Sequence, residues 1–199
     1  PQSMTIACDL DGVLAEYNMP THHLFSKWGP MRPMLGDPDR WFWYDAYGAT
    51  AEMIAAATAE QTVDWWATLP KHRDFTPRVA ALLTELHART ELTFVSARSC
   101  PREASLRWLA THLPELDGPQ VIHTPRKALL LSALQPDHYL DDAWTLVRDY
   151  LQLMPQAAAR THLVERRYNQ REMAPSPRRA LSTEHALEVI LDAVNGGRE

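Results

Sequence analysis

Short apolar runs alternate with amphipathic segments along most of the chain, which is the pattern of β-strands alternating with α-helices. The run 4–10 (MTIACDL) leads into Asp11-Gly12, which predicts a buried strand followed by a turn. Further short runs predict strands at 92–96, 120–123, 138–141 and 161–165. Strands that are separated by helices pair in parallel, so we expect an α/β fold with a Rossmann-like, mostly parallel sheet and helices on both faces.

Helix-start signals stand between these runs. Thr76-Pro77 supplies an N-cap and a first-turn proline, and the apolar positions 79, 82, 83 and 86 then share one helix face. Further helices are expected from Pro101 to Leu113, from Thr124-Pro125 onward, and from Thr183 to Val194. The Arg- and Pro-rich stretch 166–179 shows neither period and is expected to be a loop.

The segment 16–74 breaks the alternation, because it contains no strand pattern. It holds two helical candidates, 50–60 and 62–69, and five of the seven tryptophans, at positions 28, 41, 43, 65 and 66. We therefore expect a helical cap over 16–74, inserted between the two parts of a core domain made of residues 1–15 and 75–199.

The composition is that of a folded globular chain. Hydrophobic residues make up 45% and charged residues 23%, which excludes a disordered protein. The formal net charge of −5 argues against binding to long nucleic acids, although a small anionic substrate needs only a local positive site. Two cysteines are too few for a disulfide framework, and neither a membrane span nor a secretory signal is visible, so a cytoplasmic location is expected.

Two acidic residues, Asp9 and Asp11, stand at the end of the first expected strand. Strand periodicity aims both side chains to one side, where they could share a metal ion; the alternative is a solvated pair in a turn. Gly12 adds a tight turn that lets the backbone approach a ligand closely.

Further polar residues stand where later strands end. Ser96 closes the second strand and Asp141-Asp142 closes the fourth. Lys127 falls in the first turn of the helix after Thr124, where the helix dipole disfavours a cation unless an anion is bound; otherwise the side chain points into water. Because the carboxyl ends of parallel strands meet at one edge of a sheet, we expect these residues to converge.

The ordered set Asp9-Leu10-Asp11-Gly12-Val13, Ser96, Lys127 and Asp141-Asp142 resembles the four motifs of the haloacid dehalogenase superfamily. The resemblance covers residues 4–15 and 75–165, and the insertion resembles that superfamily's helical cap. The second aspartate of the first motif is similar to that of the superfamily's phosphatases. Among these, the segments LPKHRDFTPRVAALLTELH, TFVSAR, VIHTPRKALL and HYLDDAW most resemble the 5'(3')-deoxyribonucleotidase-like branch.

This resemblance implies a role for each motif residue. Asp9 would be the nucleophile that forms an aspartyl-phosphate, and Asp11 would be the general acid and base. The Asp9 carboxylate, the Asp11 backbone carbonyl and Asp141 would hold Mg²⁺, with Asp142 as a supporting partner or an alternative ligand. Ser96 and Lys127 would bind oxygens of the transferring phosphoryl group.

The sequence departs from that branch in two places. Ala97-Arg98 follows Ser96 where a small residue and a proline are expected, so these are candidate substrate contacts, and Arg98 either contacts the phosphate or forms a structural ion pair. The cap matches only at WWATLP, and its aromatic side chains either pack its own core or stack on a nucleobase. The candidate stacking residues are Trp65 or Trp66 together with one of Trp41, Phe42 and Trp43.

Three functions stay open at this level. The favoured one is a Mg²⁺-dependent phosphomonoesterase that acts on nucleoside monophosphates, a 5'-nucleotidase or deoxyribonucleotidase. The second is the same chemistry on another small phosphate ester or on a nucleic-acid end. The third is a non-catalytic protein that binds a phosphorylated ligand on the same scaffold, which the intact residues at all four motifs disfavour. The sequence indicates no oligomeric state.

Overall fold

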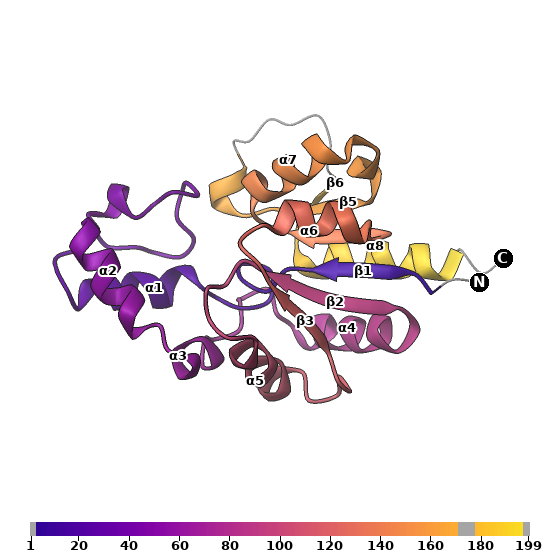
Figure 1. Cartoon of the computed structure of the whole chain (residues 1–199), viewed down its shortest axis with the longest axis horizontal. Coiled ribbons are helices and arrows are strands. Elements are labelled where there is room, and N and C mark those ends of the chain that lie inside the picture. The colour runs from indigo at the N-terminus through magenta and orange to yellow at the C-terminus, as the bar shows by residue number, and fades with distance from the viewer. Residues whose placement is uncertain (1–2, 171–177, 197–199) are drawn as a thin grey trace.

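A parallel β-sheet forms the centre of the structure, a computed structural model that describes residues 3–170 and 178–196 (Figure 1). In these ranges six strands lie in the order β3-β2-β1-β4-β5-β6, and every neighbouring pair is parallel. The order reverses between β1 and β4, and such a reversal opens a crevice at the carboxyl ends of the strands. The strand bounds are β1 Thr5–Cys8, β2 Glu91–Ser96, β3 Gln120–His123, β4 His138–Asp141, β5 Thr161–Val164 and β6 Arg178–Ala180.

Helices cover both faces of the sheet, which confirms the expected Rossmann-like architecture. Alternate residues of β1 supply two apolar cores: Ile6 and Cys8 pack with α4, α5 and α8, whereas Ala7 packs with α6 and α7. No helix in the described ranges has both the length and the apolar character needed to cross a membrane. The helix bounds are α4 Pro77–Arg89, α5 Arg102–His112, α6 Lys127–Leu134, α7 Trp144–Leu153 and α8 Thr183–Gly196.

The N-termini of α4, α5 and α8 lie within one residue of the positions expected from the sequence, whereas that of α6 differs. Thr76 caps α4 as expected, because its hydroxyl accepts a hydrogen bond from the Val79 N–H at 3.2 Å. The expected start of α6 at Thr124-Pro125 is wrong, since that helix begins at Lys127. The Thr124 hydroxyl instead accepts the Arg126 N–H at 3.1 Å and stabilises the turn before the helix.

The apolar patterns did not predict four elements described in the core: α7, β6 and two 3₁₀ helices. Helix α7 follows β4 almost directly, and the 3₁₀ helix η2 (Pro155–Arg160) leads into β5. The loop expected over 166–179 is wrong at both ends, because Arg167–Asn169 forms the 3₁₀ helix η3 and β6 begins at Arg178; residues 171–177 lie outside the described residues. Strand β6 reads RRA and so lacks the apolar run by which a strand is recognised.

The insertion between β1 and α4 consists of helices and loops, and Figure 1 shows α1 and α2 beyond the carboxyl end of β1. Its own apolar cluster includes Phe25, Trp43 and Met53. Helix α3 packs instead against α5, and Trp66 joins the main core. The division into a 16–74 cap and a 1–15 plus 75–199 core stays a prediction, and residues 16–74 are called the cap below. Its helices are α1 Asn18–Ser26, η1 Asp45–Tyr47, α2 Ala51–Glu60 and α3 Val63–Ala67.

Candidate active site

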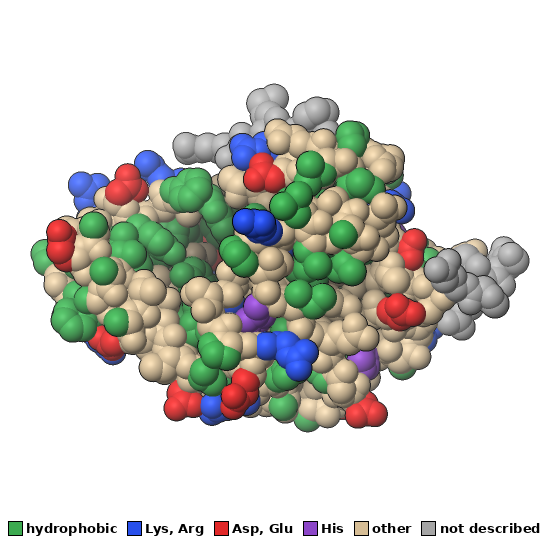
Figure 2. All heavy atoms as spheres, in the orientation of Figure 1, with side chains coloured by type: hydrophobic (Ala, Val, Ile, Leu, Met, Phe, Trp, Pro, Cys, Tyr) green, Lys and Arg blue, Asp and Glu red, His purple; other side chains and the backbone are tan. Residues whose placement is uncertain are grey.

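A cavity of about 270 Å³ lies between the carboxyl ends of β1 and β2 and the cap. Figure 2 shows a hollow in this region with hydrophobic side chains along its cap side. The core contributes Asp9, Asp11, Ser96, Ala97 and Arg98 to the wall. The cap contributes Tyr17, Trp41, Tyr44, Gln61 and Trp66.

The turn after β1 places Asp9 at the base of this cavity. The Asp9 N–H still donates to the Leu140 carbonyl at 2.9 Å, so the residue continues the β1–β4 ladder beyond the strand end. Gly12 then adopts φ +77°, a left-handed conformation that side chains disfavour. A Cβ atom at Gly12 would also collide with the Asp142 carboxylate, so a glycine is required for the close approach of the two loops.

Lys127 is fully buried and bridges two carboxylates. Its Nζ lies 2.8 Å from Asp9 Oδ1 and 2.6 Å from Asp141 Oδ2. Burial lowers the pKa of Lys127, but the negative charges of Asp141 and Asp9 outweigh that effect and raise it above its usual value. The side chain is therefore a fixed positive charge at the carboxyl edge of the sheet.

Three buried carboxylates, those of Asp9, Asp141 and Asp142, offer ligand atoms within 4.8 Å of one another. Burial raises the pKa of Asp9 to about 7, with Lys127 opposing and the charges of Asp141 and Asp11 adding to the rise. Burial, together with the charges of Asp141 and Asp9, raises the pKa of Asp142 well above its usual range.

Mg²⁺, which the resemblance implies, fits this cluster. Its donors are all oxygens, which a hard divalent ion prefers. Among the residues that the structure describes, Oδ1 of Asp142 is buried without a hydrogen-bond partner. Both Asp141 oxygens accept hydrogen bonds, one from Lys127 and Tyr139 and the other from the Ala143 N–H. Three buried carboxylates face one ammonium group, so an additional cation would reduce their repulsion.

Asp11 lies at the same cavity wall but outside this carboxylate group. The Arg98 guanidinium donates to it from Nε at 2.9 Å and from Nη2 at 2.6 Å. Of the two roles that the sequence left open for Arg98, the structure therefore displays the ion pair. Ser96 is fully buried at the end of β2, and its hydroxyl accepts the Arg98 N–H at 3.2 Å, so β2 supplies the hydroxyl and the loop that follows it supplies the guanidinium.

No family model and no curated protein matches the sequence. Solved structures match over nearly the whole chain. A haloacid dehalogenase-like family hydrolase from Streptococcus pneumoniae is 14% identical with a TM-score of 0.60, over 96% of this chain and 98% of that chain. A haloacid dehalogenase family hydrolase from Deinococcus radiodurans R1, solved with bound phosphate and sodium, is 13% identical with a TM-score of 0.55, over 98% and 97%. A third such hydrolase, from Xanthomonas campestris, is 11% identical with a TM-score of 0.53, over 100% of both chains.

The chain has the haloacid dehalogenase-like fold. This confirms the expected fold class, whereas the resemblance to the 5'(3')-deoxyribonucleotidase-like branch stays a prediction. In this haloacid dehalogenase-like fold, the structure brings Asp9, Asp141, Asp142 and Lys127 into one cluster and sets Asp11 and Ser96 beside it.

The predicted aromatic residues divide between the cavity wall and the cap interior. Trp66 lines the cavity, stacks on Tyr17 with ring centroids 5.5 Å apart and carries Arg98 over its ring at 5.0 Å. Trp41 also lines the cavity and is 37% exposed. Trp43 is buried in the cap's apolar cluster. Neither Trp65 nor Phe42 is among the residues that line this cavity.

A group of residues after β5 was missed by the sequence reasoning. The buried Arg166 donates from Nε to the Gly12 carbonyl at 2.7 Å, and Tyr168 donates its hydroxyl to Asp142. Asn169 donates to the Asp142 carbonyl at 2.8 Å. The polar run that follows the strand at 161–165 could have indicated these residues, because β5 ends at the same edge of the sheet as β1 and β4.

Proposed function

We propose that this protein is a Mg²⁺-dependent phosphomonoesterase of the haloacid dehalogenase superfamily that hydrolyses nucleoside monophosphates. The observation that carries the proposal is the buried Lys127 ammonium between Asp9 and Asp141 beneath the cavity. It provides a carboxylate nucleophile beside a fixed cation, which is the arrangement that attack on an anionic phosphate needs. The bound phosphate of the Deinococcus hydrolase, which shares the fold, supports this assignment.

The proposed reaction has two displacements. A carboxylate oxygen of Asp9 attacks phosphorus, the ester P–O bond breaks, and Asp11 gives a proton to the leaving alkoxide. Asp11 then takes a proton from the incoming water, whose oxygen attacks phosphorus and breaks the bond to Asp9. Inorganic phosphate leaves and the Asp9 carboxylate is restored. Lys127 and the Ser96 hydroxyl would bind the phosphoryl oxygens during both steps.

The candidate Mg²⁺ ligands are the Asp9, Asp141 and Asp142 carboxylates and the Asp11 backbone carbonyl. Asp142 is favoured over Asp141 as the direct ligand, because Oδ1 of Asp142 has no hydrogen-bond partner within residues 3–170 and 178–196 while both oxygens of Asp141 accept hydrogen bonds. When bound, the ion would supply positive charge beside the phosphoryl oxygens.

The aromatic wall supports a nucleoside rather than an aliphatic leaving group. Trp41, Trp66, Tyr17 and Tyr44 all line the cavity, and a base that stacks on an aromatic side chain gains about 1–3 kcal/mol. The Tyr17 and Tyr44 hydroxyls lie 3.1 Å apart and add polar groups to the same wall. These groups could contact a sugar.

Phosphate release from a substrate panel tests the proposal. The panel contains 5'- and 3'-nucleoside monophosphates with ribose and deoxyribose, sugar phosphates and a small aryl phosphate. We expect hydrolysis of nucleoside monophosphates that stops on chelation and returns when Mg²⁺ is restored. Asp9→Asn should reduce turnover by at least about 10³-fold, because an amide cannot serve as the nucleophile.

Asp64→Asn is the matched control, because Asp64 is a carboxylate whose side chain is 78% exposed and outside the cavity. It should retain full turnover. Wild-type turnover in Asp9→Asn would contradict the mechanism. Hydrolysis of sugar phosphates alone would favour the second function, and tight phosphate-ester binding without hydrolysis would favour the non-catalytic one.

A further inference from the structure

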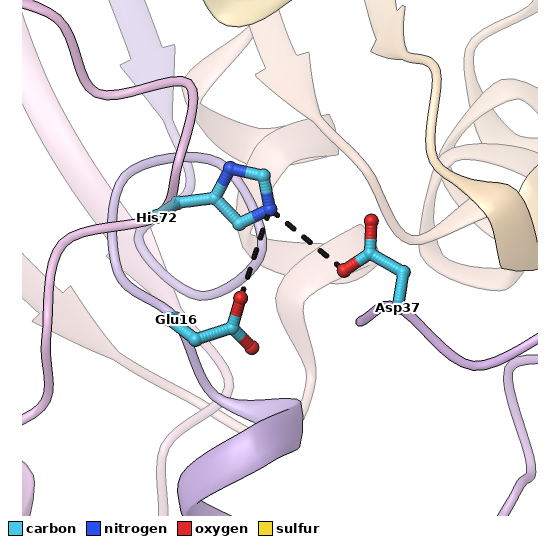
Figure 3. A group of neighbouring side chains, drawn as sticks. All are labelled: Glu16, Asp37 and His72. Carbon is cyan, nitrogen blue, oxygen red and sulfur yellow. Dashed lines mark ion pairs between the residues drawn. The ribbon is translucent and has the colours of Figure 1, made fainter. Parts of the chain in front are cut away.

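A second group of side chains with metal-binding chemistry lies where the cap joins the core. Glu16 precedes α1, Asp37 lies in the cap loop between α1 and η1, and His72 lies in the segment between α3 and α4. Figure 3 shows the three side chains pointing toward one another. One potential ligand atom of each lies within 4.8 Å of the other two, and none of the three lines the cavity described above.

Each carboxylate of this group has one oxygen held by the protein and one that faces His72. Oε1 of Glu16 accepts the N–H groups of Asn18 at 2.9 Å and Met19 at 3.3 Å, while Oε2 lies 3.9 Å from His72 Nε2. Oδ2 of Asp37 accepts from Arg73 at 2.9 Å, while Oδ1 lies 3.8 Å from the same nitrogen. The held oxygens orient both carboxylates, as supporting hydrogen bonds do at metal sites.

His72 is the decisive member. His72 is 2% exposed, and its Nε2 is buried with no hydrogen-bond partner in the described part of the chain. A buried polar nitrogen without a partner is rare in folded proteins, because it forfeits its hydration without compensation. The nitrogen points into the space between Glu16 Oε2 and Asp37 Oδ1 (Figure 3).

We propose that Glu16, Asp37 and His72 bind one divalent transition-metal ion, with Zn²⁺ as the best-fitting class. One imidazole and two carboxylates suit Zn²⁺, whereas Mg²⁺ prefers the all-oxygen set at the other site. Bond lengths of about 2.0–2.2 Å to a tetrahedral ion separate the ligand atoms by roughly 3.4 Å. The separations from His72 Nε2, 3.9 Å to Glu16 Oε2 and 3.8 Å to Asp37 Oδ1, would therefore shorten by about 0.4–0.5 Å. The ligand atoms of the two carboxylates lie within 4.8 Å of each other and would also draw together, and water would complete the coordination.

The imidazole must present a lone pair on Nε2 to the ion. In the structure the Asp74 N–H donates to His72 Nδ1 at 3.2 Å, which places the proton of a neutral ring on Nε2. Metal binding moves that proton to Nδ1. That change gives up the hydrogen bond from the Asp74 N–H. The Asp74 Oδ2 atom, which accepts from Arg166 at 2.7 Å, lies 4.0 Å from Nδ1 and would need to move closer to accept a hydrogen bond from it.

The position of the site gives the ion a structural role. Glu16 and His72 belong to the two connections between cap and core, and Asp37 belongs to the loop that leads to Trp41. An ion held by all three would tie that loop to both connections. Since it would bind the folded protein and not the unfolded chain, Zn²⁺ should also raise the melting temperature.

Zinc binding in excess Mg²⁺ tests the proposal, because Mg²⁺ would compete for the all-oxygen cluster that the proposed function assigns to it. Calorimetry on the wild-type protein should show one Zn²⁺ equivalent, and Co²⁺ in its place should give the visible absorption of a low-symmetry site. Asp37→Asn and His72→Gln should each weaken Zn²⁺ binding at least tenfold and abolish the rise in melting temperature. Two variants keep the test specific: His23→Gln removes an exposed histidine, and Asp142→Asn alters the other cluster, and both should retain the Zn²⁺ equivalent.

The proposal is overturned if the wild-type protein takes up no Zn²⁺ under these conditions. It is equally overturned if His72→Gln and Asp37→Asn both bind Zn²⁺ as the wild type does, or if Asp142→Asn removes the equivalent. Glu16→Gln covers the case in which one of the other variants fails to fold. Phosphatase activity is not measured in this test, and Asp142→Asn separates the two clusters, so failure of the proposed function and failure of the zinc site give different results.

Discussion

The Arg98 guanidinium donates two hydrogen bonds to the Asp11 carboxylate, one from Nε and one from Nη2. The Arg98 side chain is itself fully buried, with Nη1 donating to the Ser105 hydroxyl at 2.9 Å and the Trp66 ring beneath it. The position of Asp11, the proposed general acid and base, is therefore fixed by the segment after β2 as well as by the turn after β1. Burial lowers the pKa of Arg98, but the Asp11 charge outweighs that effect and raises it, so Arg98 stays cationic.

A double-mutant cycle measures this pair. Arg98→Gln, Asp11→Asn and the double variant should reveal a coupling of about 1–3 kcal/mol in the free energy of unfolding, because either single change leaves a partner without its charge in a buried site. The matched pair is Arg107–Asp64, which is 2.7 Å apart but exposed, and should couple by only about 0.2–1 kcal/mol. Urea denaturation gives all the values. Equal coupling in the two cycles would show that burial adds nothing.

Turnover should separate from binding in Asp11→Asn. The amide can still accept a hydrogen bond from Arg98, so the cavity keeps its shape, but it cannot exchange a proton with the leaving group or water. We expect kcat to fall by about 10²–10⁴-fold with KM nearly unchanged. Steady-state kinetics on the best substrate of the panel measures both. A rise in KM with kcat intact would assign Asp11 to binding instead.

Trp41 offers the cleaner test of base stacking, because Trp66 also belongs to the main core. Trp41→Ala should lower kcat/KM for a nucleoside monophosphate by roughly 5–150-fold, which corresponds to about 1–3 kcal/mol of lost stacking. Hydrolysis of a small aryl phosphate should change little. Phe42→Ala is the control, since Phe42 is 76% exposed and does not line the cavity. Equal losses on both substrates would mean that Trp41 supports the cap rather than the substrate.

Two buried histidines make stability depend on pH. His138 Nδ1 and His162 Nε2 lie 3.0 Å apart, and burial together with nearby positive charge lowers the pKa of His162 to about 3. A histidine in the unfolded chain titrates near 6.5. Between these values the unfolded chain binds a proton that the folded protein does not. Stability is therefore lost as the pH falls from about 6.5 toward 3, by up to about 1.4 kcal/mol per pH unit.

Removal of His162 should reduce that loss. The stability difference between wild type and His162→Gln should shrink as the pH falls from 7 to 4, whereas the difference for His23→Gln, at an exposed position, should stay nearly constant. Urea denaturation at three pH values provides the comparison. A pH-independent difference for His162→Gln would mean that the folded protein accepts the proton at this site.

Local patterns predicted the elements whose signals lie within a few residues. The apolar run before Asp9, the Thr76 cap and the polar residues at strand ends all depend on neighbours in sequence, so they could be found without the structure. The hold of Arg98 on Asp11 and the contacts of Tyr168 with Asp142 depend on packing between distant segments. The hydrophobic periodicity and the helix-capping signals carry no information about such pairs. Strand β6 was not predicted because its three residues include no apolar run.

The central place of β1 has a consequence for folding. In the sheet, Thr5 pairs with Glu91 and Ile6 pairs with His138, so both neighbours of β1 come from much later in the chain. During synthesis the whole cap emerges before either partner strand of β1 has been made. Until then the apolar residues of β1 are exposed and can form non-native contacts. Pairings of such long sequence separation form slowly, because their loop entropy must be lost first. The ladder that carries Asp9 therefore closes late, and the ability to bind substrate should appear only after most of the chain has folded.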